Sequence, residues 1–293
     1  MISERTIANA KLKATLKSVG IYAVLILAAL VILGPLYIVL VISFMDKAEA
    51  MSPAFTLWPE NFNLHGYVEV FSYVSGGTGA LPTVVAGFFN TMYVVVPPTL
   101  VGILMSALSA FAFSKMKFKG SNFLFSILLS TMMIPGTISM IPSFLIFDKI
   151  GWTDTFLPLM VPTFFGGAGT VFFLKQFFFS IPDDLIEASK VDGLSNFGAF
   201  RQIILPLSVP ALVAQFVMQF VAGYNAYLGP LLYLYSPEKY TLQIALNFFK
   251  GTYSTDYSVV MAGAISSLLP TTILYLIGQN YFLEGMATSG MKL

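Results

Sequence analysis

Six long apolar stretches constrain the fold of this chain more than any other feature of its sequence. They occupy residues 21–44, 84–114, 123–147, 157–179, 203–235 and 259–282. A helix needs about 20 apolar residues to cross a bilayer, whereas a membrane β-barrel is built from segments of about 10 residues that alternate in polarity. Because the stretches are continuous rather than alternating, they predict an all-α, polytopic membrane protein with six transmembrane helices.

Composition excludes several classes of protein. Of the 293 residues, 57% are hydrophobic and only 10% are charged, whereas a soluble domain has about 25% charged residues. The chain has no cysteine and a single histidine, His65, so disulfides and Cys- or His-rich metal sites are excluded and we predict no metal site. A net charge of +1 gives no reason to expect a nucleic-acid partner.

Basic residues indicate how the six helices are oriented. The first apolar stretch is too long for a secretory signal peptide, so it is interpreted as a retained span. With both termini in the cytoplasm, eleven of the fifteen basic residues lie in cytoplasmic segments, as the positive-inside rule requires. The cytoplasmic set is Arg5, Lys11, Lys13, Lys17, Lys115, Lys117, Lys119, Lys175, Lys190, Arg201 and Lys292.

This topology divides a single transmembrane domain, residues 1–293, into named segments. We expect a cytoplasmic N-terminal segment at 1–19, a periplasmic loop at 45–82, a cytoplasmic loop at 180–202 and a cytoplasmic C-terminal tail at 284–293. A second outer loop covers residues 236–257.

The apolar stretches contain almost no ionisable residues; Lys175 lies near the cytoplasmic end of the fourth. Ion-coupled transporters need such groups near the middle of the membrane, so this class is not favoured. No paired carboxylates or Ser/His/Asp set indicates an enzyme, and no catalytic residue is predicted. The stretch "GGAGT" at residues 166–170 lacks the lysine and the spacing of a phosphate-binding P-loop. ATP would therefore have to bind to another polypeptide.

Neutral polar side chains inside the apolar stretches are candidates for a solute path. Amides and phenols bind hydroxyl-rich solutes without burying a charge. Equally, they form hydrogen bonds between helices and hold a bundle together, and the sequence leaves both interpretations open. Three of them cluster in "GYNAYLG", residues 223–229. The candidate set is Asn90, Gln215, Gln219, Tyr224, Asn225 and Tyr227.

The cytoplasmic loop at 180–202 reads as two short helices joined by a tight corner. Pro182 suits the start of a helix, and two aspartates follow it where they complement the helix dipole. Gly193 offers a left-handed stop, and Ser195 can cap the second helix. The small side chains of Ala188 and Ser189 allow close approach of a partner. From these residues alone, the loop is either a docking element or an amphipathic anchor at the membrane surface.

The stretch "EASKVDG" in this loop and the stretch "IILP" that follows the loop resemble a known signature. It is the coupling-loop signature of permease subunits of bacterial binding-protein-dependent ABC importers. Ser189 replaces the second alanine of that signature. Residues 132–144, 172–193, 237–246 and 278–293 also resemble the carbohydrate branch of this family, in particular its smaller, maltose-type permease subunit. The signature positions are Glu187, Ala188, Gly193, Ile203, Leu205 and Pro206.

The resemblance implies a type I ABC importer permease fold in the bacterial inner membrane. Expected partners are a second permease subunit, two cytoplasmic ATPases that bind ATP and Mg²⁺, and a soluble solute-binding protein that contacts the outer loops. This chain itself would bind no cofactor. Residues expected to contact the ATPases are Glu187, Ala188, Ser189, Asp192 and Gly193 in the coupling loop, and Ser289, Gly290 and Lys292 in the C-terminal tail.

The function that the resemblance implies is ATP-driven import of sugars or oligosaccharides by alternating access. The same architecture could instead import an anionic saccharide such as alginate oligosaccharide, a polyol or glycerol phosphate. A passive channel or scaffold is the alternative from a different class.

Overall fold

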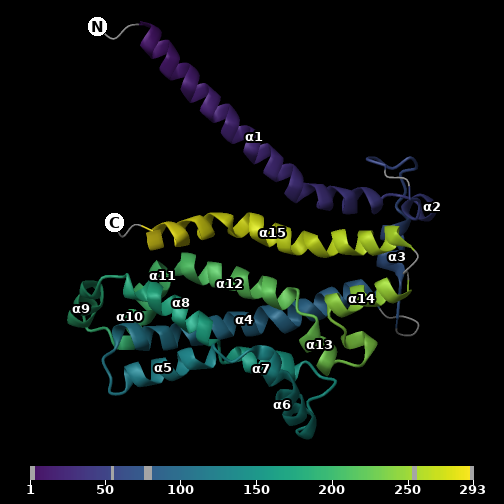
Figure 1. Cartoon of the computed structure of the whole chain (residues 1–293). Helices are drawn as coiled ribbons and strands as arrows, with labels where there is room; N and C mark the ends of the chain where they lie inside the picture. Colours follow the sequence, from purple (N-terminus) through teal and green to yellow (C-terminus); the bar gives the residue numbers. More distant parts are fainter. Residues whose placement is uncertain (1–3, 54–55, 76–80, 253–255, 291–293) are drawn as a thin grey trace. The chain divides into compact units, whose positions relative to one another are not determined.

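The computed structural model describes residues 4–53, 56–75, 81–252 and 256–290. Regular structure in these residues is helical, as predicted (Figure 1). The chain divides into two compact units, one made of Met1–Val70 and Phe249–Ser266 and the other of Phe71–Phe248 and Ser267–Leu293. Each unit is described by itself.

The first unit contains α1 (Glu4–Ile42), α2 (Lys47–Ala50) and the starts of α3 (His65–Ser72) and α15 (Tyr257–Gly290). The ring of Phe44 stacks on that of Phe62, with centroids 4.8 Å apart. At the start of α3, the imidazole of His65 lies 3.4 Å from the carboxylate of Asp256. Gly66 follows His65, and a Cβ added there would lie 2.6 Å from the carbonyl oxygen of Ser258. Glycine therefore permits this close approach of the backbones.

The second unit contains the remaining helices, except that residues 249–252 at the end of α14 belong to the first unit. They are α4 (Thr83–Lys115), α5 (Ser121–Thr131), α6 (Gly136–Lys149), α7 (Leu157–Phe164), α8 (Ala168–Phe179), α9 (Asp183–Val191), α10 (Asn196–Ala199), the π-helix η1 (Phe200–Ile204), α11 (Leu205–Leu207), α12 (Val209–Tyr224), α13 (Leu228–Tyr233), the 3-10 helix η2 (Pro237–Lys239) and α14 (Leu242–Thr252). Helix α4 is central to this unit, because it packs against α7, α8 and α12.

A buried apolar cluster joins α4 and α8 to the segment that follows α8. Its members come from α4, α8, α9, α10, η1 and α12, so it continues from the long helices into the predicted coupling loop. We refer to it as the α4–α8 core. Its buried side chains are Ala107, Ala110, Phe111, Val171, Leu174, Phe178, Ile181, Ile186, Ala199, Phe200, Ile204 and Ala211.

The candidate membrane spans agree with the prediction of six. Four are Thr15–Ile42, Thr83–Lys115, Leu157–Phe179 and Tyr257–Gln279. Two bent helix pairs complete six if each pair is one span: Ser121–Thr131 with Gly136–Lys149, and Asn196–Leu207 with Val209–Tyr224.

Three of the predicted stretches are not the continuous helices that their hydropathy suggests. Residues 165–167 separate α7 from α8 within the fourth, and the other two bend sharply. The pair α5 and α6 bends by 91° at a break that includes Pro135, and the fifth stretch bends by 74° at Ser208. Proline lacks an N–H donor and restricts the residue before it, which favours a helix end at Pro135. A further interruption, residues 225–227, separates α12 from α13.

Candidate functional site

Helix α9 and the corner after it form as the local sequence predicts. The helix starts at Asp183, directly after Pro182, and ends at Val191. Gly193 then adopts the left-handed conformation, with φ of 85°, which glycine allows at little cost. The hydroxyl of Ser195 caps α10 by accepting a hydrogen bond from the N–H of Gly198 at 3.1 Å. The prediction of two short helices with a tight corner is confirmed.

Helix α9 has a buried face and an exposed face. Ile186 and Ser189 are 4% and 3% exposed, and Ile186 belongs to the α4–α8 core. The Ser189 hydroxyl donates to the carbonyl oxygen of Ile186 at 2.7 Å. Of the five predicted coupling residues, Ser189 therefore lies inward, and its small size lets α9 approach the core. The other four, Glu187, Ala188, Asp192 and Gly193, are exposed.

An ion pair ties the start of α9 to the end of α4. The side chain of Lys115 is only 2% exposed, and its ammonium donates to the carboxylate of Asp183 at 2.6 Å and to the carbonyl oxygen of Ile181 at 2.5 Å. The hydrogen bond from Lys115 lowers the pKa of Asp183 below its ordinary value, and the charge of Lys117 adds to this effect. Sequence reasoning missed this pair, since the partners are separated by 68 positions and no local pattern joins them.

A hollow of about 380 Å³ lies between the end of α4 and α9. Both signs of charge line it, so it can receive a mixed polar surface. Apolar side chains are exposed nearby, with Val191 88% and Phe197 63% exposed. An exposed helix with apolar side chains and a polar rim is typical of a docking surface. The lining residues are Lys115, Met116, Lys117, Asp183, Ile186, Glu187, Lys190 and Asn196.

Three of the predicted solute-path residues, Asn90, Gln219 and Tyr224, make hydrogen bonds between segments. The Asn90 amide donates to the carbonyl oxygens of Glu238 and Tyr240, at 2.9 Å and 3.0 Å. The Gln219 amide donates to the hydroxyl of Thr170 at 3.1 Å. These contacts match the alternative in which polar side chains hold the bundle together.

Tyr224 and Gln215 are buried, at 1% and 6% exposure. The Tyr224 hydroxyl donates to the carbonyl oxygen of Ser267 at 2.9 Å. Asn225 and Tyr227 lie in the interruption between α12 and α13. Asn225 is exposed, although its amide also donates to the carbonyl oxygen of Val221, one turn earlier.

The predicted ATPase contacts in the C-terminal tail have little structural description. The backbones of Ser289 and Gly290 end α15. The side chain of Ser289 and all of Lys292 lie outside the described part of the chain.

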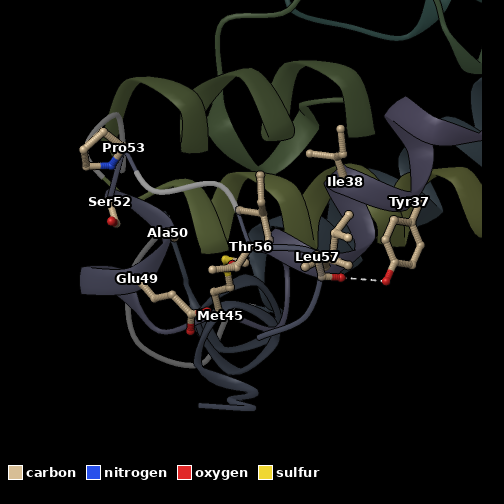
Figure 2. A pocket seen from close by; sticks show the side chains of 11 residues that line it. Tyr37, Ile38, Met45, Glu49, Ala50, Ser52, Pro53, Thr56 and Leu57 are labelled. Carbon is tan, nitrogen blue, oxygen red and sulfur yellow. Dashed lines mark hydrogen bonds between the residues drawn. The ribbon is translucent and has the colours of Figure 1, made fainter. Parts of the chain in front are cut away.

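A smaller pocket of about 170 Å³ lies in the first unit, between the end of α1 and the segment after α2 (Figure 2). The Tyr37 hydroxyl closes one side by donating to the carbonyl oxygen of Leu57 at 2.6 Å. Ligand sites usually have volumes of about 300 Å³ or more. This pocket therefore does not suit an oligosaccharide.

Known proteins that resemble this chain are transport permeases. The chain is 30% identical over 281 residues to the inner membrane ABC transporter permease protein YcjP of Escherichia coli, covering 96% of this chain and 98% of YcjP. It is 29% identical over 266 residues to the arabinooligosaccharides transport system permease protein AraQ of Halalkalibacterium halodurans, covering 90% of this chain and 92% of AraQ.

It is also 31% identical over 271 residues to the sn-glycerol-3-phosphate transport system permease protein UgpE of Escherichia coli, covering 92% and 95% of the two chains.

The fold agrees with a solved structure. A chain in the crystal structure of a bacterial ABC transporter involved in the import of the acidic polysaccharide alginate matches with a TM-score of 0.76 at 23% identity. The match covers 96% of this chain and 99% of the other. The ABC importer permease fold predicted from the sequence is confirmed.

Residues 99–286 match the family described as binding-protein-dependent transport system inner membrane component. Members of this family are non-catalytic, multi-pass permease components of inner membrane ABC importers that work with binding proteins. The chain belongs to this family.

Proposed function

We propose that this permease imports sugars or oligosaccharides and that α9 is the element through which an ATPase drives it. The main observation in favour of this proposal is that α9 has one face packed into the protein and one face exposed. Ile186 is packed into the α4–α8 core, while Glu187, Ala188 and Asp192 remain exposed to a partner. Movement of a docked α9 would therefore reach α4 and α8 directly.

The assembly that we propose contains a second permease subunit and two cytoplasmic ATPases, which bind ATP and Mg²⁺. A solute-binding protein delivers solute to the outer loops at 45–82 and 236–257. ATP binding closes the ATPases, α9 follows, and the spans switch the side on which the path opens. The segments assigned from the sequence stay part of this proposal: 1–19, 180–202 and 284–293 face the cytoplasm, and 1–293 form one permease domain.

The interruption between α12 and α13 is the best candidate for contact with solute. A broken span leaves backbone groups without helical partners, which is tolerated in a membrane where the segment is buried in protein or lines an aqueous cavity. Asn225 and Tyr227 lie in this interruption. Ala222 and Met218 are exposed one and two turns before Asn225, so the described chain leaves this face of α12 open.

Two solute classes are candidates. AraQ, whose name refers to arabinooligosaccharides, favours a neutral oligosaccharide. UgpE, whose name refers to sn-glycerol-3-phosphate, favours a small phosphorylated polyol. Neutral amides and phenols in the spans suit the first class better, because they supply no cation to balance a phosphate. We therefore propose the oligosaccharide as the main solute.

The proposal is tested by ATPase activity of the complex reconstituted with its partner permease, ATPase and binding protein. Neutral oligosaccharides, acidic oligosaccharides and glycerol phosphate are added in turn. Stimulation that requires both the binding protein and a neutral oligosaccharide is expected, because solute reaches the permease through the binding protein. The same assay on Asn225→Ala should change the relative stimulation by the solutes. Stimulation by glycerol phosphate alone would favour the second class, and stimulation by no solute would contradict import.

Lys115→Met is expected to destabilise the permease by about 1 kcal/mol, since Asp183 is 75% exposed and solvent screens the pair. The pair requires an ionised Asp183, whose folded pKa is lowered. Its contribution is complete above the unfolded pKa of about 3.9 and is lost as the pH falls through the folded pKa. Thermal unfolding from pH 7 downward measures this difference between variant and wild type.

Lys117→Met is the matched control, because Lys117 is exposed and contributes less to the pKa of Asp183. It should leave the unfolding temperature nearly unchanged. An equal effect of the two substitutions, or a difference that does not shrink in acid, would contradict a specific role of the Lys115–Asp183 pair.

A further inference from the structure

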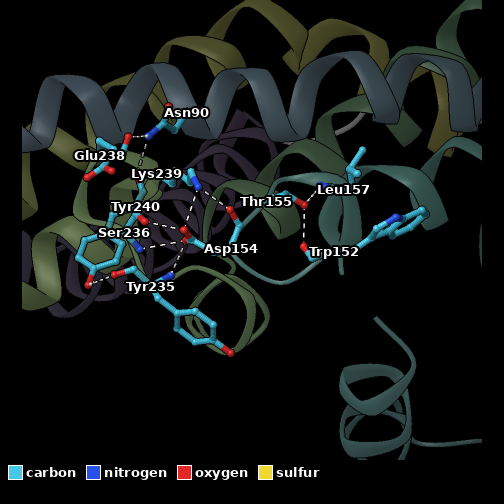
Figure 3. A network of polar contacts seen from close by, with 10 residues as sticks. All are labelled: Asn90, Trp152, Asp154, Thr155, Leu157, Tyr235, Ser236, Glu238, Lys239 and Tyr240. Atoms are coloured by element: carbon cyan, nitrogen blue, oxygen red, sulfur yellow. Dashed lines mark hydrogen bonds and ion pairs between the residues drawn. The ribbon is translucent and has the colours of Figure 1, made fainter. Parts of the chain in front are cut away.

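A set of polar contacts joins two connections that are far apart in the sequence (Figure 3). Asp154 lies between α6 and α7, and its carboxylate accepts hydrogen bonds from the N–H groups of Tyr235 and Ser236, at 2.9 Å and 3.0 Å, and from the Ser236 hydroxyl at 2.5 Å. The Lys239 ammonium lies 2.8 Å from the same carboxylate. We refer to Asp154, Ser236 and Lys239 as the polar clamp.

The backbone of Asp154 also takes part in the clamp. Its N–H donates to the carbonyl oxygen of Tyr233 at 2.7 Å, and its own carbonyl oxygen accepts from the Lys239 ammonium at 2.6 Å. Among the described residues, Asp154 is the one non-glycine residue with a positive φ, 53°. Such a conformation costs free energy and persists where surrounding contacts require it. The clamp supplies those contacts.

The clamp carboxylate is held in its ionised form. Hydrogen bonds from Lys239 first, and from Ser236 next, lower the pKa of Asp154 well below its ordinary range. The side chains of Asp154 and Lys239 are 29% and 37% exposed, so solvent screens them only in part. The ion pair therefore persists across the physiological pH range.

Neighbouring contacts extend the clamp to other helices. Asn90 of α4 donates to the carbonyl oxygens on both sides of Lys239. At the end of α6, the ring of Phe147 stacks on that of Trp152, with centroids 5.5 Å apart, and meets the ring of Tyr233 edge-on at 5.6 Å. The segment 233–240 is thus bound to α4, to the end of α6 and to the connection before α7.

We infer that Asp154 is a positioning residue that holds the start of the outer loop at 236–257 in the orientation in which it receives the binding protein. The inference rests on the proposed function, which assigns this loop to contact with the binding protein. A loop that is ordered before docking loses less conformational freedom when its partner binds. Without the clamp, the loop must be ordered during docking, so the affinity for the binding protein falls.

The test is a titration of the reconstituted complex with solute-loaded binding protein, with ATP hydrolysis as the readout. Asp154→Asn tolerates the positive φ but removes the charge that pairs with Lys239. Lys239→Met removes the ammonium and keeps a long apolar stem. Both should raise the concentration of binding protein that gives half-maximal stimulation by about tenfold. The rate of ATP hydrolysis at saturating binding protein should stay within about twofold of wild type. Once the binding protein is docked, the variant and wild-type complexes have the same arrangement of the loop.

Three further variants separate positioning from a general structural effect. Lys239→Arg keeps a cation in the clamp and should restore half-maximal stimulation to near the wild-type concentration. Asp148→Asn and Lys149→Met change exposed charged side chains at the end of α6, outside the loop at 236–257, and should match wild type.

The outcomes are distinguishable. Unchanged half-maximal concentrations in Asp154→Asn and Lys239→Met would overturn the inference and leave the proposed function intact. A lower saturating rate with an unchanged half-maximal concentration would overturn it too, because a positioning role predicts the reverse. If binding protein does not stimulate the wild-type complex, the proposed function itself fails.

Discussion

Glu187→Lys is expected to lower solute-stimulated ATP hydrolysis by about tenfold or more while the four-subunit complex still assembles. Glu187 is exposed on α9 at the rim of the hollow beside α4. If α9 docks on an ATPase, the reversed charge meets a surface that accepts a carboxylate. An unpaired or repelled charge in a protein interface costs about 2–5 kcal/mol, which corresponds to a tenfold or larger change in an equilibrium. ATPase activity with saturating binding protein and solute measures the effect.

Two variants control this prediction. Glu187→Gln removes the charge without reversing it and should give a smaller loss. Asp148→Lys makes the same reversal at an exposed carboxylate near the end of α6, outside the proposed docking site, and should hydrolyse ATP like wild type. Copurification of the ATPase with each variant separates failed docking from failed transmission. Wild-type stimulation in Glu187→Lys would contradict the role assigned to α9.

Gly166→Ala is expected to lower the free energy of unfolding by about 2–5 kcal/mol, which combines the cost of a left-handed alanine with that of overpacking. Gly166 has φ of 80°, and an added Cβ would collide with the Ser106 hydroxyl and lie 2.7 Å from the carbonyl oxygen of Gly102. Both contacts belong to α4, so the new methyl group would push the turn between α7 and α8 away from that helix. Thermal unfolding and the yield of monodisperse protein in detergent measure the loss.

Gly167→Ala is the matched control for this substitution. Gly167 directly follows Gly166, but its φ is −134° and an added Cβ would meet only the Thr170 hydroxyl, at 3.8 Å. This variant should unfold at nearly the wild-type temperature. If both alanines destabilise the chain equally, the explanation from backbone conformation and close approach is wrong.

The spans were predictable, because apolar stretches of about twenty residues occur mainly in transmembrane helices. The positions at which these helices are interrupted were not predictable. Prolines do not decide where a helix ends: Pro97 and Pro98 lie inside the unbroken α4, and Pro270 lies inside α15. Pro135, in contrast, lies at a bend of 91°. Hydropathy averages over a window and carries no information about which carbonyl groups find a replacement partner.

The candidate docking helix was predictable where local chemistry controls the backbone. Pro182, Gly193 and Ser195 each act on their own neighbours, so their effects could be read from the sequence. The Lys115–Asp183 pair and the polar clamp depend instead on which helices pack together. Ser189 shows the same limit, because its position in the signature did not reveal that its side chain faces the core.

The α4–α8 core has a mechanical consequence. Close-packed protein interiors have low compressibility and pass displacement on rather than absorbing it. Ile186 of α9 and Phe178 of α8 share this core, with Phe178 completely buried. If an ATPase displaces α9, the packed core transmits that displacement to α8 without first deforming. The movement of the ATPase and the first movement of the span would therefore occur together.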